Sequence, residues 1–218
     1  MSEHDFEPVR GLPEDLPAGE HIVWQGAPDW KLMARRVFHM PLVSIYFGAL
    51  MAWRGAEATA AGATAVEALQ SALWVTPLAT AALGLLAGLA WLNCRTTVYT
   101  ITNKRVVMRF GAALTKAINI PFTIIEGADV KLFADGGGDI ALTLVKPNKI
   151  AYLHLWPHAR PGKLGHPQPT FRSVANAAAV ASSLSMTLQR AAGQTVTPPA
   201  AVQPENATSP AHSQPALA

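Results

Sequence analysis

The sequence predicts a membrane protein in which a hairpin of two transmembrane α-helices precedes a small α+β domain, an antiparallel sheet capped by a C-terminal helix. Three observations predict this fold class. Two apolar stretches lie in the first half of the chain, at 37–53 and 72–92. From residue 96 onward, hydrophobic residues recur about every second position, as in β-strands. An Ala-rich segment without Gly or Pro, 171–192, then shows the apolar stripe of a helix.

Residues 1–30 are expected to form an N-terminal cytoplasmic segment. A short apolar run, Ile22 to Trp24, lies between two turn-forming stretches that contain Pro, Gly and Asp. This run predicts either one short strand or a segment that lies on the membrane surface. The transmembrane hairpin is expected to follow at 31–95.

The second apolar stretch, 72–92, has no charge over about 20 residues, which at about 1.5 Å per residue covers the roughly 30 Å hydrocarbon core of a bilayer. The first stretch, 37–53, lies at the short end of the permitted range and contains His39 near its start. Together they predict two spans joined by a periplasmic loop at 55–70.

Tryptophans and charges support this topology. Trp30 and Trp53 bracket the first stretch, and Trp74 and Trp91 bracket the second, as expected for indole rings at headgroup level. Basic residues flank the outer ends of the pair, Lys31, Arg35 and Arg36 before it and Arg95, Lys104, Arg105 and Arg109 after it. The loop between the spans offers only Arg54. This asymmetry predicts a multi-pass membrane protein with both termini in the cytoplasm.

Small residues predict close helix packing. Gly84 and Gly88 form a Gly-x-x-x-Gly pair in the second span, and Gly48 and Ala52 give the first span a similar face. The contact is expected either within the hairpin or between two copies of the chain. The general abundance of Ala and Gly gives the same pattern without any contact.

The cytoplasmic domain is expected at 96–192, followed by a disordered tail at 193–218. Strands are predicted at 97–102, 105–110, 117–120, 124–133, 140–145 and 150–155. Turns at 135–139 and 147–149 join the last three into an antiparallel meander. A loop rich in Pro, Gly and His, 157–169, precedes the capping helix.

Composition limits the remaining possibilities. With 218 residues, 50% hydrophobic and 14% charged, the chain has room for the hairpin and one small domain. The formal net charge is +3, but the cations are scattered and no aromatic residues interleave with them, which argues against nucleic-acid binding. A basic surface suits a domain held beside an anionic leaflet. The single cysteine, Cys94, excludes an internal disulfide.

No group of residues predicts catalysis, so we expect no enzyme, no metal site and no cofactor. His154 and His158 are four residues apart, but Pro157 opposes the helix that would bring them together. Both are expected to be solvated loop residues. The run Gly136 to Gly138 lacks the Lys and the helix of a phosphate-binding loop and predicts a hairpin tip.

Two motifs nevertheless resemble a known family. The stretch from Pro17 to Pro28 has the pattern Gly-Glu, Trp, Gly, Pro. After the hairpin, Tyr99, Thr102 and Arg105 form a Tyr-x-Ile-Thr-x-x-Arg motif. Both resemble the bacterial pleckstrin-homology-like membrane proteins, and over about Leu12 to Ala192 the order of features is similar to the photosynthetic-complex assembly proteins of purple bacteria.

The resemblance implies a curled antiparallel sheet or barrel with one C-terminal helix. It also implies a non-enzymatic helper that assembles reaction-centre and light-harvesting 1 subunits in the inner or intracytoplasmic membrane. In this hypothesis Gly84 and Gly88 lie at a transmembrane contact, and the loops around 157–169 and 136–138 contact soluble parts of partners. A histidine in a span raises the alternative that His39 ligates a pigment's magnesium, but a helix-start position explains His39 without a ligand.

The alternative function is a lipid-headgroup sensor or scaffold. In this alternative, Lys104, Arg105 and Arg109 gather anionic phosphates beside the bilayer. The structural interpretation of Arg105, which we favour, is that it pairs with a carboxylate or carbonyl and holds the first hairpin turn.

Overall fold

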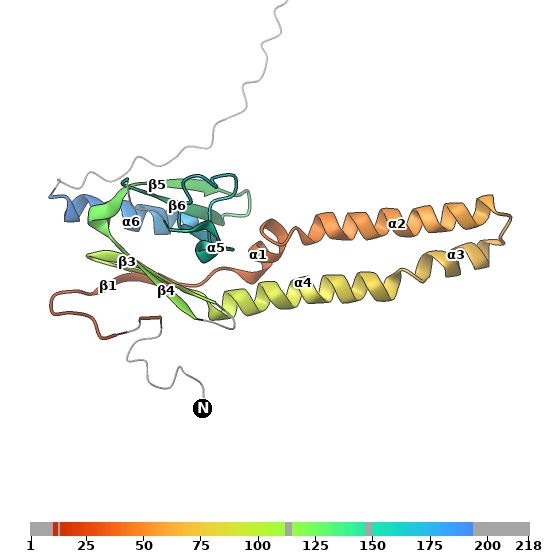
Figure 1. Ribbon diagram of the computed structural model, residues 1–218, viewed down its shortest axis with the longest axis horizontal. Coiled ribbons are helices and arrows are strands. Elements are labelled where there is room, and N and C mark those ends of the chain that lie inside the picture. Colours follow the sequence, from red (N-terminus) through yellow and green to blue (C-terminus); the bar gives the residue numbers. More distant parts are fainter. Residues whose placement is uncertain (1–10, 13, 112–114, 147–149, 194–218) are drawn as a thin grey trace, which may run out of the picture.

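A long helical hairpin projects from one end of a β domain built from two sheets (Figure 1). The computed structural model describes residues 11–12, 14–111, 115–146 and 150–193. The turn expected at 147–149 and the tail expected at 193–218, apart from its first residue, lie outside the described residues.

The helical hairpin interrupts the first sheet. β1 (Ile22–Gly26) pairs antiparallel with β2 (Val98–Thr102), and all of the hairpin lies between these two strands in the sequence. β3 (Arg105–Phe110) and β4 (Lys116–Pro121) complete the sheet in the order β1-β2-β3-β4. The strand interpretation of residues 22–24 is confirmed, and this strand belongs to the β domain rather than to a separate N-terminal segment.

The second sheet contains β5 (Ile125–Leu132), β6 (Gly138–Leu144) and β7 (Thr170–Val174), in that order and all antiparallel. A 3₁₀ turn, Phe122–Ile124, joins the two sheets, and α6 (Ala177–Ala191) lies against β5 and β6 (Figure 1). The fully buried members of the shared core include Tyr99, Ile101, Met108, Ile120, Ile140, Leu142, Phe171 and Leu184. The antiparallel sheets and the C-terminal helix predicted from the sequence are confirmed.

The strand expected at 150–155 is wrong. This segment forms α5, a single helical turn at Tyr152–Leu155, in which Leu155 is buried and Leu153 is 84% exposed. Periodicity cannot separate a strand from a helical turn in so short an apolar run. The third strand of the second sheet is β7 instead, which follows the 157–169 loop.

The helix predicted from residue 171 begins later than expected. Ser173 and Asn176 have φ angles of 54° and 53°, which an α-helix cannot contain, so α6 starts only at Ala177. Phe171 and Val174, three residues apart, fit a helical stripe as well as they fit a buried strand. The apolar spacing therefore predicts that both residues lie in the helix, whereas they belong to β7.

Four helices make up the hairpin: α1 (Trp30–Arg36), α2 (Met40–Ala60), α3 (Ala65–Leu73) and α4 (Thr76–Thr96). The first apolar stretch is not one continuous helix, because His39 has a φ of 52° and separates α1 from α2. Its Nδ1 lies 3.0 Å from the carbonyl oxygen of Val37. The interpretation of His39 as a helix-start residue is confirmed, since it is the N-cap of α2.

The connection expected as a loop at 55–70 is largely helical. Thr64 and Glu67 form a reciprocal capping box at the start of α3, which stabilises that helix by satisfying its free N–H groups. Arg54 pairs with Glu57 at 3.0 Å and donates to Ser71 across the hairpin at 3.5 Å. The far tip of the hairpin is therefore polar and folded.

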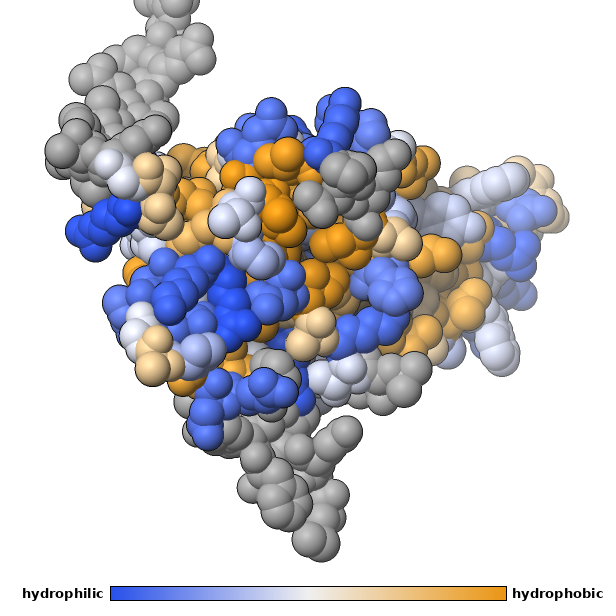
Figure 2. Space-filling view, turned by 60° about the vertical axis from the view of Figure 1, so that its left-hand side comes forward, coloured by the Kyte–Doolittle hydropathy of each residue, from blue (hydrophilic) through white to orange (hydrophobic). Residues whose placement is uncertain are grey.

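Among the described residues, one helical segment is long and apolar enough to cross a membrane. It is Ala65–Thr96, with a mean hydropathy of 1.7 in its most apolar window, of which 6% is buried. Arg54 and Glu57 lower the hydropathy of α2, which does not meet the same criterion. In Figure 2 hydrophobic surface runs along the hairpin behind the more polar β domain. These apolar side chains face outward, unlike those of a soluble core helix.

The β5–β6 hairpin tip packs closely against α1 and α6. A Cβ atom on Gly137 would collide with the side chain of Leu32 in α1. A Cβ on Gly138 would lie 2.5 Å from the carbonyl oxygen of Lys131 and 2.8 Å from the Cβ of Ala177. The hairpin tip predicted at 136–138 is confirmed. Gly137 and Gly138 are buried and Gly136 is exposed, so contact of this loop with a partner stays a prediction.

We predict that Gly138→Ala destabilises the protein by about 1–3 kcal/mol, because neither the Lys131 backbone nor α6 can move away cheaply. Gly127→Ala in β5 is the matched control, since its added Cβ would meet no atom within 4 Å. Thermal unfolding of both variants in detergent, followed by circular dichroism, measures the difference. Equal midpoints would show that the tip is not tightly packed.

Candidate functional site

The two family motifs bind each other at one end of the first sheet. Thr102 Oγ1 accepts hydrogen bonds from the backbone N–H groups of Lys104 and Arg105, at 3.1 and 3.0 Å, and so fixes the β2–β3 turn. Arg105 Nε then donates to Glu20 Oε1 at 2.7 Å. The side chain of Glu20 is only 3% exposed. The structural interpretation of Arg105 is confirmed, because it pairs with a carboxylate that precedes β1.

The environment keeps Glu20 ionised. Burial alone raises the pKa of this carboxyl, but hydrogen bonds with Arg105 and Thr102 and the positive charges of Arg105 and Lys104 outweigh burial. The pKa of Glu20 therefore lies below its usual value. Asn103 strengthens the same junction, since its Nδ2 donates to the Gly19 carbonyl at 3.0 Å.

The third motif residue, Tyr99, lies at the centre of a buried polar network. Its hydroxyl is 2.7 Å from His158 Nδ1 and accepts a hydrogen bond from the backbone N–H of Arg172 at 3.1 Å. Its ring stacks on Phe171 with centroids 4.5 Å apart. His158 Nε2 also lies 3.3 Å from Thr97 Oγ1. This network joins the start of β2 to β7 and to the loop after α5.

His158 is completely buried, so the expectation that it is a solvated loop residue is wrong; His154 is exposed as expected. Burial, with a smaller effect from the charge of Arg172, lowers the pKa of His158 to about 3. The imidazole is therefore neutral at physiological pH. Its two nitrogens bind Tyr99 and Thr97, which makes it a structural residue.

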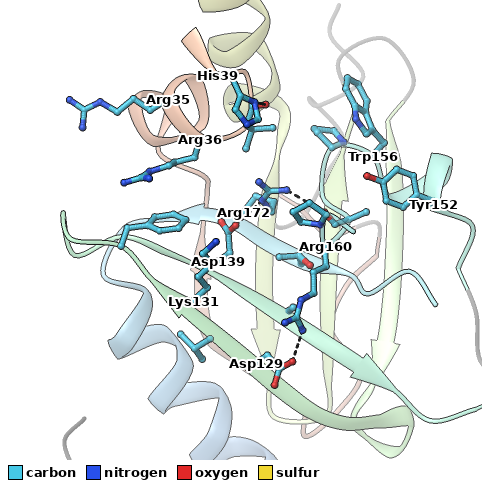
Figure 3. A pocket seen from close by; sticks show the side chains of 18 residues that line it. Arg35, Arg36, His39, Asp129, Lys131, Asp139, Tyr152, Trp156, Arg160 and Arg172 are labelled. Atoms are coloured by element: carbon cyan, nitrogen blue, oxygen red, sulfur yellow. Dashed lines mark hydrogen bonds and ion pairs between the residues drawn. The ribbon is translucent and has the colours of Figure 1, made fainter. Parts of the chain in front are cut away.

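A cleft of about 620 Å³ opens between α1, β5 and the segment after α5. Its lining contains five cations, Arg35, Arg36, Lys131, Arg160 and Arg172, and two carboxylates, Asp129 and Asp139. In Figure 3 Arg172 and Arg160 lie in its middle, Arg36 and His39 come from the hairpin side, and Tyr152 and Trp156 stand on the other side. The sequence did not predict this cleft.

The carboxylates of the cleft already have partners. Asp139 Oδ2 lies 3.0 Å from Arg172 Nε, and its Oδ1 accepts from the Ser173 backbone N–H at 2.8 Å. Asp129 pairs with Arg160, which also donates to Gln168 Oε1 at 2.9 Å. These pairs hold two arginines in place.

The cations predicted to bind headgroups do not come together. Arg109 stands opposite Val98, at the end of β2 next to α4, whereas Arg105 lies at the other end of β3. Lys104 is exposed in the turn beside Arg105, away from the hairpin. The structure therefore offers no joint site for these three residues, and Arg105 is held by Glu20.

The small residues of the hairpin do not pack within it as expected. A methyl group on Gly48, Gly84 or Gly88 would meet no atom within 4 Å in the described chain. Ala52 instead lines a shallow groove between α2 and α3 together with Ala68. The expectation that these three glycines pack within the hairpin is therefore wrong. Packing against a second copy or another protein stays a prediction.

Comparison with known proteins identifies the class. Residues 42–187 match the family described as Bacterial PH domain, and the chain belongs to this family. A Rhodobacter capsulatus protein described as an uncharacterized 23.7 kDa protein in the puhA 5′ region is 40% identical over 192 residues, 87% of this chain and 90% of the relative. These matches confirm the resemblance stated from the motifs and mark the chain as PuhB-like. No solved structure matches it.

We predict that Arg105→Gln and Glu20→Gln each destabilise the protein, with a coupling energy of about 1–3 kcal/mol in the double-mutant cycle, because the pair is a charged hydrogen bond with little solvent access. Arg54→Gln, which breaks the exposed pair with Glu57, should cost much less. Chemical unfolding in detergent measures both.

The pH dependence has a defined sign. The pKa of Glu20 is lower in the folded protein than in the unfolded chain, where it is about 4.3. The contribution of ionised Glu20 to stability is therefore fully present above the unfolded-state pKa and is lost as the pH falls through the folded-state pKa. The difference between wild type and Glu20→Gln should therefore shrink in acid. A difference that stays constant down to the folded pKa would contradict the ion pair.

Proposed function

We propose that this protein is a non-enzymatic assembly factor of the bacterial inner, or intracytoplasmic, membrane that helps reaction-centre and light-harvesting 1 subunits to assemble. Membership of the Bacterial PH domain family and the similarity to a protein in the puhA 5′ region support the proposal. The observation that carries it is an apolar hairpin, exposed along its length, whose two ends are both anchored in the β domain.

The pairing of β1 with β2 supports two membrane crossings. These strands are hydrogen-bonded neighbours, so they lie on the same side of any membrane, and the chain between them crosses it an even number of times. If α4 crosses, α2 crosses back. Its 21 residues span about 31 Å, enough for the hydrocarbon core, and its charged residues lie near the far tip.

The outward faces of the hairpin suit contact with other transmembrane helices. Gly84 and Gly88 lie on the exposed side of α4, where a partner helix could approach the backbone closely. In the β domain, β4 and β5 are each one of the two edge strands of their sheets and leave backbone groups for pairing with a partner strand. A second copy of this chain is the alternative occupant of the hairpin surface.

A non-catalytic role agrees with how the buried polar groups are used. Tyr99, His158, Arg172 and Asp139 bind one another or nearby backbone. Their geometry explains how the domain is held together, and each has a structural partner.

We predict that deletion of the gene lowers the reaction-centre and light-harvesting 1 absorption bands of isolated membranes, because unassembled subunits do not accumulate. A plasmid copy of the wild type should restore both bands. Gly84→Leu with Gly88→Leu should restore them less well, whereas the conservative pair Leu85→Ile and Leu89→Ile, on the flank of the same helix, should restore them. Normal bands in the deletion strain under all growth conditions would refute the proposal.

Cysteine labelling tests the topology. In a Cys94→Ser background, Ala61→Cys at the tip of the hairpin should react with a membrane-impermeant maleimide in intact spheroplasts. Lys104→Cys in the β domain should react only after the membrane is permeabilised. Both positions are exposed, so access depends on the membrane alone. If Ala61→Cys were protected from labelling in intact spheroplasts, the hairpin would not cross the membrane.

A further inference from the structure

The cleft between α1, β5 and the segment after α5 has more positive than negative charge. Arg172 and Arg160 are matched by Asp139 and Asp129. Arg36 lies over the ring of Phe133, with its Cζ 4.8 Å from the centroid, and forms no ion pair with any described residue. Lys131 stands opposite Asp139 in the β5–β6 ladder but forms no ion pair with it or with another described residue. Arg36 and Lys131 thus line the cleft without an ion pair among the described residues, and the lining as a whole has five cations and two carboxylates.

Arg172 gives the cleft a preorganised donor. Its side chain is 9% exposed, and its Nη1 donates to the Ala159 carbonyl at 3.3 Å. Its Nε lies 3.0 Å from Asp139 Oδ2 in an ion pair but forms no hydrogen bond. Its Nη2 has no partner among the described residues. A guanidinium fixed in this way offers its free N–H groups in one direction, which suits the oxygens of a phosphate.

If the hairpin crosses a membrane as proposed above, the cleft lies at the level of the membrane surface. Arg36 ends α1, and His39, which also lines the cleft, directly precedes the apolar helix α2. Leu153 in α5 is 84% exposed, and Trp156, which directly follows α5, is 59% exposed, although both are large and apolar. Side chains of this kind are typical of the interface between headgroups and acyl chains.

We propose that this cleft binds the phosphate of an anionic phospholipid headgroup from the cytoplasmic leaflet. Lys131, Arg36 and the free edge of Arg172 hold the phosphate, and Trp156 and Leu153 enter the bilayer beside it. The ligand class is the one first considered for Lys104, Arg105 and Arg109, but the site is a different one. The inference rests on the membrane topology proposed above but not on the proposed role in assembly.

A binding measurement on the full-length protein tests this site. The protein is purified in a non-ionic detergent, and its thermal unfolding midpoint is followed while dihexanoyl phosphatidylglycerol, dihexanoyl phosphatidylcholine or glycerol phosphate is added. The phosphatidylglycerol should raise the midpoint at the lowest concentration, since it combines the anionic phosphate with acyl chains. The zwitterionic lipid and the soluble phosphate should act only at much higher concentration.

Variants then locate the site. Arg36→Gln and Lys131→Gln should each weaken the apparent affinity for phosphatidylglycerol about fivefold. Lys104→Gln, which removes the same charge from the far end of the first sheet, is the matched control and should leave the affinity unchanged. Arg172 is not substituted, because its loss would disturb the Tyr99 network. Folding of each variant is checked by its midpoint without lipid.

Three outcomes would overturn the proposal. Equal stabilisation by phosphatidylglycerol and phosphatidylcholine would show that the headgroup charge is not recognised. Equal stabilisation by glycerol phosphate would assign the cleft to a soluble phosphate ester. Equal loss in Lys104→Gln would show a general effect of net charge. None of these results bears on the absorption bands of a deletion strain, so failure here and failure of the assembly role are distinguishable.

Discussion

The hydrogen-bonded pairing of β1 with β2 is the constraint on which the rest of the structure depends. It holds the two ends of the hairpin side by side, at the spacing of neighbouring strands. α1 is thereby brought against α4, where Met33, Ala90 and Cys94 form a small buried cluster. The same placement lays α1 against the β5–β6 tip, which creates one wall of the basic cleft. The β domain and the apolar hairpin are thus joined into one unit by the β1–β2 pair.

The family motif residues stabilise the junction between the β domain and the hairpin. Glu20 comes from the segment before the hairpin and Arg105 from the segment after it. Their ion pair joins the start of β1 to the start of β3, at the end of the first sheet that lies away from the hairpin. Tyr99, near the start of β2 and so close to the hairpin, binds His158 and the backbone of Arg172. Because the motif residues are structural, the motif identifies the fold but does not indicate a ligand. The surfaces that recognise ligands can then differ between members of the family.

Sequence reasoning predicted what depends on local pattern. The apolar helix α4, the β2–β3 turn with Thr102 and the capping helix are all set by neighbouring residues, and the structure contains them. The second predicted span, α2, does not reach the same hydropathy because Arg54 and Glu57 lie within it. It failed where distant groups decide the conformation. Arg172 and Ser173 are held in β7 by Tyr99 and Asp139, which no helical stripe reveals. The cleft was missed because its cations come from four separate elements, each with an ordinary local context.

The insertion of the hairpin between adjacent strands also orders the synthesis of the chain. β1 leaves the ribosome first but has no partner until β2 is translated, after both apolar helices have emerged. If only one of them entered the lipid, β2 would be delivered to the opposite compartment and the first sheet could not close. The first sheet could then form only in a chain whose two long hairpin helices had both entered a membrane or both stayed outside it. A chain with one inserted helix would expose an unpaired strand edge.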